Sequence, residues 1–493
     1  MKIFLIFRDH TDKVCVPIIR ALEKEGHQVL YWLGVQNNSK EEFPHTIFHS
    51  DADARQILPA KGIDPDKFMP PGADIAERLS ETESLMMSLL EKRNSNLYHS
   101  QQKHNYHKLL RYWLGVFKKF KPDVIIFPTS PANFVTFFIH QLAKLFKVKT
   151  IMFSDSWIGD RTIVHTDFWE PGQRILDEKI EANKDKNFSL NELSQDIQKY
   201  YKPHAADSHD AAPMCTKQIN KRYSGLNLFK YKLNIIKKNI GGFRIVRIFA
   251  SHLKKRFGAN LRKEHFELEK KPNLNEKFVY LPLQYQPERS TSPLGGIFVD
   301  QILLVETVSA ALPRGWKIYI KEHPYQWQKN GLNYNFARPR GYYEKIAAIK
   351  NVTLVPITTD SFDLINRSKA VVTTTGTPAW EAYLRKKPSI IFGTQWFRSC
   401  PQIFKANDAV SCRNAFEKIR QGHEIKDQDI INYLKSIEEA SIHCLIDELV
   451  GDKLDLGESD LTFDQRLSNV IEAIIDELNH FKKNSHALET NQN

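Results

Sequence analysis

Short apolar runs alternate with segments of helical periodicity along the first 170 residues. This alternation is typical of βαβ units, and it predicts a parallel sheet with crossover helices on its faces. The runs expected as strands are Lys2–Phe7, Gln28–Leu33, Val124–Phe127 and Lys149–Phe153, and the expected helices include Val14–Glu25, Ser80–Phe120 and Phe134–Phe146.

A second βα series begins near residue 276, after an interruption of the alternation. Its expected strands are Phe278–Leu283, Trp316–Ile320, Val352–Val355, Ala370–Thr374 and Pro388–Phe392, and its expected helices are Val299–Leu312, Ser361–Asn366 and Thr377–Leu384. The interruption, about residues 171–272, is first polar and then basic, with Gly241-Gly242 dividing the basic part into two amphipathic pieces. The pattern therefore predicts two separate βα sheets joined by a linker.

The composition excludes several classes of protein. The length of 493 residues predicts about two to three domains, and a chain that is 41% hydrophobic is too apolar for overall disorder. No run approaches the roughly 18–20 apolar residues of a membrane helix, and Arg8 ends the apolar start too early for a signal peptide, so we expect a cytosolic protein. The five cysteines are scattered without a CxxC pair, which favours reduced buried thiols over disulfides or a zinc site.

The net charge of +12 is concentrated in one segment. Between Lys217 and Lys271 there are 16 Lys and Arg against three acidic residues, so the rest of the chain sums to about −1. The basic stretch at 226–263 mixes cations with apolar residues, which favours an anionic membrane surface over nucleic acid, with a plain helical hairpin as the structural alternative. The residues expected to contact the membrane are Lys237, Lys238, Arg244, Arg247, Lys254, Lys255 and Arg256.

The densest candidate motif is Val371–Ala382, where an apolar strand runs into a Thr/Gly turn. Thr377 is placed to N-cap a helix with Pro378 at its first position, and such a helix start favours phosphate. Gly376 permits a ligand to approach the backbone closely. Glu381, one turn later, is placed to accept hydrogen bonds from ribose hydroxyls. An ordinary capped helix is the equally weighted alternative.

Two further loops follow expected strands. Lys321-Glu322-His323-Pro324 delivers His323 to a strand end, where an imidazolium could offset charge on a leaving phosphate or move a proton. The loop around Glu288, Arg289 and Ser290 is rich in polar, Gly and Pro residues, which is typical of binding loops. There, Glu288 is a candidate base and the other two are candidate phosphate ligands, unless Glu288 and Arg289 merely pair with each other.

In the N-terminal half, Asp155, Asp160 and Arg161 lie on the loop that follows the strand Lys149–Phe153. A carboxylate at this edge is a candidate general base for an acceptor hydroxyl, and His10 after the first strand is a weaker candidate. Neither HExxH nor GxGxxG occurs, so the residues support no metal-dependent or nicotinamide mechanism.

Residues of about 276–395 resemble the bacterial capsule and surface-polysaccharide biosynthesis proteins. The resemblance rests on His323-Pro324, on Thr375 to Ala382 and on the polar loop Gln286 to Gly296. The family's Kdo transferases normally have Lys-Pro-His-Pro, and this chain has Glu322 in place of the first proline of that motif. It implies an α/β, GT-B-like fold of two facing Rossmann-like domains with the basic helical insertion between them. The implied division is 1–170 for the acceptor domain, 171–272 for the insertion, 273–425 for the nucleotide-sugar domain, and 426–493 for C-terminal helices with a loose tail.

The resemblance also implies functional roles. His323 would contact the donor phosphate, Lys321, Thr375, Gly376 and Thr377 would lie at the donor, and Glu381 would contact ribose or sugar. We therefore expect a metal-independent glycosyltransferase, without a cofactor, that takes a CMP- or UDP-linked sugar as donor. The expected acceptor is a glycan or glycolipid at the inner-membrane surface, and no nucleic acid is bound. The alternatives are a nucleotide-sugar 2-epimerase of the same fold and a non-catalytic polysaccharide or membrane assembly factor.

Overall fold

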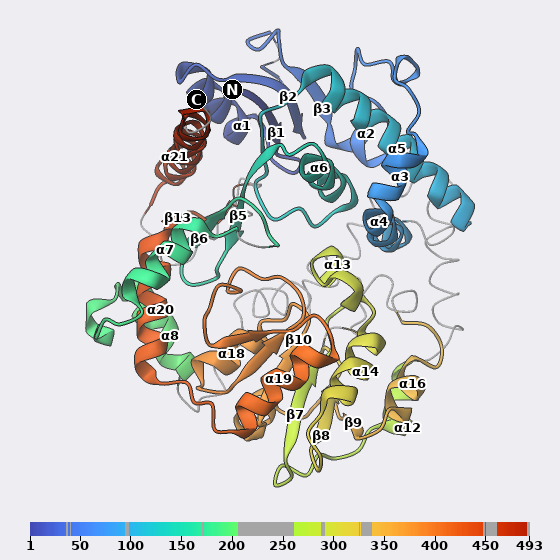
Figure 1. Ribbon diagram of the computed structural model, residues 1–493, viewed down its shortest axis with the longest axis vertical. Coiled ribbons are helices and arrows are strands. Elements are labelled where there is room, and N and C mark those ends of the chain that lie inside the picture. The colour runs from blue at the N-terminus through green and yellow to red at the C-terminus, as the bar shows by residue number, and fades with distance from the viewer. Residues whose placement is uncertain are drawn as a thin grey trace, which may run out of the picture.

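Two mainly parallel sheets form the framework of the protein, one in each half of the chain (Figure 1). The computed structural model describes residues 1–35, 38–39, 41–93, 98–169, 172–205, 261–286, 291–324, 326, 338–446, 449 and 461–490. The basic stretch 226–263 and its expected membrane contacts Lys237, Lys238, Arg244, Arg247, Lys254, Lys255 and Arg256 lie outside the described residues, except for 261–263.

The N-terminal sheet has seven strands in the order β13-β6-β5-β4-β1-β2-β3. Its strands are β1 (Lys2–Ile6), β2 (Gln28–Gly34), β3 (Ile47–Ser50), β4 (Val124–Ile126), β5 (Lys149–Asp155), β6 (Arg161–His165) and β13 (Ser441–His443). β6 pairs antiparallel with both β5 and β13, whereas the other pairs are parallel. Ile3 and Leu5 pack on one face and Phe4 and Ile6 on the other, which explains the uninterrupted apolar run of β1.

Helices cover both faces of this sheet. They are α1 (Asp12–Lys24), α2 (Asp51–Arg55), α3 (Ala73–Arg78), α4 (Ser80–Arg93), α5 (His99–Phe120) and α6 (Phe134–Leu145), with a 3₁₀ turn η1 (Pro65–Lys67). Their buried positions recur at helical spacing, as in α1, where Val14, Ile18 and Leu22 face the sheet. The βα series expected from the sequence is confirmed here.

The C-terminal sheet has six strands in the order β12-β11-β10-β7-β8-β9, all parallel. Its strands are β7 (Phe278–Pro282), β8 (Lys317–Lys321), β9 (Val352–Val355), β10 (Ala370–Thr373), β11 (Ser389–Ile391) and β12 (Ile403–Lys405). The helices around it are α12 (Leu261–Leu268), α13 (Thr291–Leu294), α14 (Gln301–Ala311), α16 (Tyr342–Ala348), α17 (Ser361–Arg367), α18 (Pro378–Leu384) and α19 (Ala409–Arg420), with the 3₁₀ turn η3 (Gly296–Val299). The predicted fold class, α/β with two Rossmann-like domains, is confirmed.

The end of the chain returns to the N-terminal domain. After α20 (Asp427–Ala440), β13 pairs with β6, and α21 (Phe463–Thr490) packs beside α1 (Figure 1). Leu467, Val470, Ile474 and Leu478 lie on one face of α21 and join the core beneath the N-terminal sheet. This helix runs to Thr490. The sequence predicted a loose tail from about residue 482, because the apolar stripe of the helix reaches only as far as Phe481.

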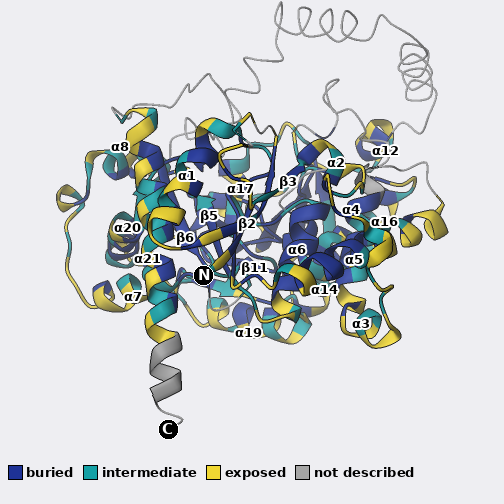
Figure 2. Cartoon of the chain, turned by 90° about the horizontal axis from the view of Figure 1, so that it is seen from above, coloured by how far each residue is buried: buried dark blue, intermediate teal, exposed yellow. Residues whose placement is uncertain are grey.

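The described part of the polar segment 171–205 is helical and docked. α7 (Arg174–Asn183) and α8 (Gln195–Ala205), separated by the 3₁₀ turn η2 (Leu190–Glu192), pack with α20 and α18 around a separate apolar cluster. Figure 2 shows buried residues as well as exposed ones on α7, α8 and α20. This cluster joins the segment to elements of the second half of the chain.

Candidate functional site

A polar pocket lies at the carboxyl edge of the N-terminal sheet, beyond β1 and β4. Its cavity volume is about 50 Å³, and it is partly open to solvent. Ligands of open α/β sheets bind at this edge. The pocket is lined by Ile6, Arg8, Asp9, His10, Phe127, Pro128, Thr129, Ser130, Ala132, Asn133 and Thr136.

The charges on the β1 side of this pocket are paired within the chain. The Arg8 guanidinium lies 2.5 Å from a carboxylate oxygen of Asp9 and 3.5 Å from one of Asp51, and Arg55 bridges the same two carboxylates. His10 donates from Nε2 to the carbonyl of Ile446, which leaves Nδ1 as a buried acceptor without a hydrogen-bond partner. Burial lowers the pKa of His10, so its imidazole is neutral at neutral pH.

A hydroxyl–imidazole cluster, Ser130, Ser154 and His165, extends from the β4 side of the pocket. The Oγ atoms of Ser130 and Ser154 are 3.1 Å apart, and they lie 3.3 Å and 2.9 Å from His165 Nε2. Nδ1 of His165 lies 3.1 Å from the carbonyl oxygen of Asp167, which can only accept, so Nδ1 carries the proton and Nε2 is the acceptor. Burial lowers the pKa of His165 to about 4, although the carbonyls of Asp167 and Phe153 oppose this shift.

Asp155 and Asp160, the predicted bases, both contact the C-terminal segment. Asp155 accepts from the hydroxyl of Thr162 at 2.5 Å and from the amide of Ile446 at 3.3 Å. Asp160 accepts from Nδ1 of His443 at 2.7 Å and lies 3.3 Å from the guanidinium of Arg466. Both carboxylates therefore have partners in the chain that hold β13 and α21 on the sheet.

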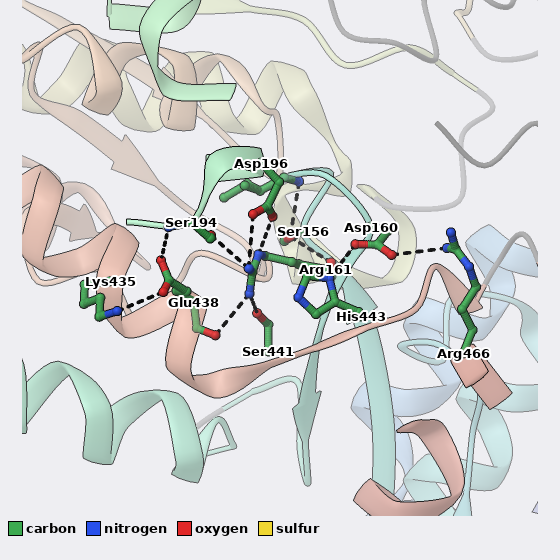
Figure 3. A network of polar contacts seen from close by, with 11 residues as sticks. Ser156, Asp160, Arg161, Ser194, Asp196, Lys435, Glu438, Ser441, His443 and Arg466 are labelled. Carbon is green, nitrogen blue, oxygen red and sulfur yellow. Dashed lines mark hydrogen bonds and ion pairs between the residues drawn. The ribbon is translucent and has the colours of Figure 1, made fainter. Parts of the chain in front are cut away.

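Arg161 lies at the centre of the same network (Figure 3). Its guanidinium donates to Asp196 at 2.6 Å, to the hydroxyls of Ser194 and Ser441, and to the carbonyl of Glu438. The sequence placed Arg161 on a loop, but it begins strand β6, and the connection from β5 is a short hairpin turn. This network explains how α8, α20 and β13 are fixed to one another at the crossover between domains.

In the C-terminal domain, buried hydroxyls gather where the segment Thr291–Gly296 meets the end of β10. The side chains of Thr291, Ser292, Thr374 and Thr375 are at most 2% exposed, and none of their hydroxyl oxygens has a hydrogen-bond partner. We call these four the hydroxyl cluster. A buried hydroxyl without a partner costs about 1–3 kcal/mol, so a hydrogen bond from each of these four to a ligand or water would be stabilising.

Three glycines bring the backbones of this region together. A Cβ on Gly376 would lie 2.6 Å from Nε2 of Gln284 and 2.7 Å from Oγ1 of Thr373. Cβ atoms on Gly295 and Gly393 would lie 2.6 Å from the methyl carbons of Thr374 and Thr375, respectively. Packing within the chain therefore already favours glycine at position 376, and the close approach of its backbone to a ligand stays a prediction.

Thr377 stands at the N-cap position of α18 but does not cap it. Its backbone is helical, and its hydroxyl lies 3.4 Å from a carboxylate oxygen of Glu381. Glu381 is 9% exposed, and burial raises its pKa to about 7, against the hydroxyl of Thr377 and the charge of Arg385. The carboxyl group is therefore close to half protonated at neutral pH.

Lys321 is the last residue of β8, and Glu322 and His323 follow it, but the charged residues of this segment face different partners. Lys321 donates to the carbonyl of Thr359 and to the hydroxyl of Ser361 at 2.8 Å, and burial lowers its pKa to about 8. Glu322 is fully buried and accepts from Arg338 at 3.1 Å and from Tyr343 at 2.6 Å.

His323 is half-buried, and its ring centroid lies 5.6 Å from that of Tyr285. Burial lowers its pKa to about 4, which favours a neutral imidazole at neutral pH over the imidazolium expected from the sequence. Glu322 is the residue at which this chain differs from the Lys-Pro-His-Pro motif. It is a buried anion next to His323, and Arg338 neutralises its charge.

The two domains interlock beside the hydroxyl cluster. Leu294 of α13 belongs to the N-terminal core, where it packs with α4. The carbonyl of Phe168, three residues after His165, accepts from the hydroxyl of Thr394 and from Arg398 at 2.6 Å. Thr394 follows Gly393, which packs on Thr375, so the loop after β6 connects the Ser130–Ser154–His165 cluster to the hydroxyl cluster.

Several predicted positions remain without a structural test. Glu288, Arg289 and Ser290 lie outside the described residues. Within the described ranges, no group of three or more His, Cys, Asp or Glu is arranged to hold a metal ion. In the same ranges, no helix combines the length and the apolar character needed to cross a membrane.

Ser130, Ser154 and His165 were missed by the sequence analysis. Ser130 follows the expected strand Val124–Phe127 by three residues, so its position at the same sheet edge as Arg8 to His10 was a usable signal. His165 gave no such signal, because the antiparallel strand β6 was not expected.

Residues 215–415 match the family described as capsule polysaccharide biosynthesis protein. The match covers less than half of the chain and shows similarity to this family over that segment. The family resemblance predicted for about residues 276–395 is thereby confirmed. The segment of this family includes His323, the hydroxyl cluster and Glu381.

Solved structures show only loose similarity. Two structures of KpsC from Thermosulfurimonas dismutans, described as beta Kdo 2,7 and beta Kdo 2,4 transferases, are 11% and 12% identical. They cover 70% and 67% of this chain and 86% and 88% of their own, with TM-scores of 0.29 and 0.30. UDP-GlcNAc 2-epimerase from Neisseria meningitidis, bound to UDP-GlcNAc, is 13% identical, covers 97% of this chain and 99% of its own, and has a TM-score of 0.23. A comparison with curated proteins found no significant match.

Proposed function

We propose that the chain is a glycosyltransferase of capsule polysaccharide synthesis that binds a nucleotide-sugar donor in its C-terminal domain. The family of residues 215–415 supports the pathway, and the hydroxyl cluster carries the assignment of the site. Phosphate oxygens accept hydrogen bonds, and the four hydroxyls of Thr291, Ser292, Thr374 and Thr375 are donors without partners. A donor phosphate bound there would satisfy groups that the protein leaves unpaired.

The neighbouring residues suit the remainder of such a donor. His323, as a neutral imidazole, can donate a hydrogen bond to a phosphate oxygen, and Glu381 lies one turn into α18. His323 and the hydroxyl cluster would stabilise the departing nucleoside phosphate without a metal, and Glu381 would contact the ribose or sugar. The acceptor would enter from the N-terminal pocket. The donor is CMP- or UDP-linked in this proposal, and the acceptor is a lipid-linked or oligosaccharide glycan.

The test compares thermal unfolding with CMP, UDP, GDP and ADP in wild type, Thr374→Val, Thr375→Val and Thr373→Val. Valine matches threonine in shape but lacks the hydroxyl. Because Thr374 and Thr375 have no partner in the chain, their valine variants should keep the stability of the free protein. Thr373→Val should lose stability, because its hydroxyl accepts from Gln284 and from the amide of Gly376.

One nucleotide at about 100 times its dissociation constant should stabilise the wild type by roughly 2.7 kcal/mol. The proposal requires that this gain shrink in Thr374→Val and Thr375→Val and persist in Thr307→Val, a control on α14 whose hydroxyl donates to Leu303. No response to any nucleotide would refute the donor site. A UDP response combined with interconversion of UDP-sugars, and no acceptor-dependent nucleotide release, would favour the 2-epimerase alternative.

We also propose that the protein is cytoplasmic and binds the inner membrane peripherally through the basic stretch 226–263. Its support is the surplus of cations interleaved with apolar residues in the sequence. Deleting residues 226–260, which stops before α12 and its core residue Leu261, should abolish co-sedimentation with phosphatidylserine vesicles while nucleotide stabilisation persists. Equal sedimentation of the wild type and the deletion variant would contradict the membrane role.

The assembly-factor alternative concerns catalysis instead. It predicts that His323→Ala leaves cellular function intact.

A further inference from the structure

We infer that Ser130, Ser154 and His165 form a proton relay that removes the proton of the acceptor hydroxyl bound in the N-terminal pocket. The inference rests on the proposed function, because it deepens the acceptor half of that reaction. Ser130 lines the pocket, Ser154 lies behind it, and His165 is the final proton acceptor.

The hydrogen-bond directions along the cluster favour this role. The carbonyl of Asp167 fixes the proton of His165 on Nδ1, so Nε2 must accept from Ser154 at 2.9 Å or from Ser130 at 3.3 Å. A hydroxyl that donates to an imidazole has its own oxygen free to accept a proton from a bound ligand. The relay therefore points from the pocket into the protein.

The pocket presents the groups that a sugar ring would need. Nδ1 of His10 is a buried acceptor without a partner, and the Arg8–Asp9 pair supplies both a donor and an acceptor. Arg8 and Arg55 balance Asp9 and Asp51, so the charges offset each other. A neutral pocket rich in hydrogen-bonding groups fits a polyhydroxylated acceptor better than a strongly charged one.

The predicted carboxylate bases are less well placed for the same step. Asp155 accepts from Thr162 and from the amide of Ile446. Asp160 accepts from His443 and faces Arg466, as Figure 3 shows, so both carboxylates are engaged by the chain itself. His165, in contrast, is one hydrogen bond away from a pocket-lining hydroxyl. The loop that follows it contacts Thr394, beside the hydroxyl cluster where the donor phosphate is proposed to lie.

The chemical step balances as follows for a direct displacement. The acceptor oxygen forms a bond to the anomeric carbon while the bond from that carbon to the phosphate oxygen breaks, and this electron pair leaves with the nucleoside phosphate. The acceptor proton moves to Oγ of Ser130, and the proton of Ser130 moves to Nε2 of His165, directly or through Ser154. Burial disfavours the imidazolium formed in this way, the carbonyls of Asp167 and Phe153 offset part of that cost, and the imidazolium then returns its proton to solvent.

The relay is tested with the full-length protein, the stabilising nucleotide sugar and capsular oligosaccharide as acceptor, by following nucleotide release. Ser130→Ala and His165→Gln should lower kcat by about 10²–10⁴-fold with little change in KM for the donor. Ser154→Ala should lose less, because the direct path of 3.3 Å from Ser130 to His165 remains. The matched control is His140→Gln, another buried histidine whose pKa burial lowers to about 4 and which also lies near Asp167.

The pH profile separates a relay from a structural role. The ionisable groups near His165 are Asp167, Arg398 and His140, and His140→Gln tests the last of these. In His165→Gln the rate should rise about tenfold per pH unit, because hydroxide replaces the lost base, whereas the wild type should be flat above pH 5. Nitrogen NMR of His165 should show the Nδ1-protonated tautomer, and an Nε2-protonated ring would overturn the proposal.

Failure of the relay and failure of the proposed function give different results. If a nucleotide stabilises all variants equally and transfer proceeds at the wild-type rate in Ser130→Ala and His165→Gln, the relay is wrong and the donor site stands. If no nucleotide stabilises the wild type and no nucleotide sugar is consumed, the proposed function is wrong, and the relay falls with it.

Discussion

Replacing Glu381 with glutamine should make the protein more stable at high pH but not at low pH. Burial raises the pKa of this carboxyl from 4.5 to about 7 in the folded state. Between these two pH values the folded protein binds more protons than the unfolded chain, so the wild type loses stability as the pH rises through this window. Glutamine keeps the size of the side chain and never ionises.

The size of the effect follows from the pKa difference. A shift of about 2.5 units at 1.36 kcal/mol per unit corresponds to about 3 kcal/mol between pH 4.5 and the plateau above pH 7. For a chain of 493 residues that unfolds in one transition, the unfolding entropy is about 1 kcal/mol per degree, so the melting temperature should differ by about 3 °C. Glu381→Gln should therefore match the wild type near pH 4.5 and exceed it at pH 8.

Paired thermal scans of wild type and Glu381→Gln at half-unit steps from pH 4.5 to 8.5 measure this difference. Glu417→Gln, at the exposed Glu417–Arg420 pair of α19, controls for the loss of one surface carboxylate. A difference between Glu381→Gln and wild type that stays constant with pH would refute the reasoning, because the carboxyl would then not be held protonated by burial. A wild type that is the more stable protein at pH 8 would show that Arg385 and Thr377 outweigh desolvation.

Three further substitutions test the packing of the site. Arg338→Met should cost about 3–5 kcal/mol in urea unfolding, because it leaves Glu322 buried without its cation, and adding Glu322→Gln should recover part of that loss. Gly376→Ala should cost about 1–3 kcal/mol, because its Cβ would lie 2.6 Å from Gln284, and a neutral result would contradict the close packing. Asp160→Asn should lower the melting temperature while nucleotide stabilisation persists, since Asp160 faces Arg466; lost transfer at unchanged stability would instead restore it as a base.

Local pattern was sufficient to predict most of the parallel strands. β1, β7 and β10 are buried on both faces, so they read as uninterrupted apolar runs that differ from the helical periodicity around them. The motif residues followed from the same logic, since His323 and Thr375 to Thr377 come directly after strands that end at one sheet edge. Parallel topology places such residues near one another without any knowledge of side-chain packing.

The antiparallel additions could not be predicted in this way. β13 has only three residues and pairs with β6 from almost 280 residues away, so no local periodicity marks their pairing. The roles of Asp155 and Asp160 depended on that pairing, because both carboxylates contact the segment around β13. An acidic residue beside a strand end looks the same in sequence whether it faces a ligand or a returning chain.

The departure at Glu322 shows how a change within a motif can be absorbed by the fold. A carboxylate with no exposed surface next to His323 would be very costly alone, but Arg338 and Tyr343 both donate to it, and Arg338 also donates to the carbonyl of Gln284. The pair thus connects the loop after β8 to the loop after β7. Because both loops end at the hydroxyl cluster's side of the sheet, the buried ion pair positions the backbone around the proposed donor site while its charges remain within the protein.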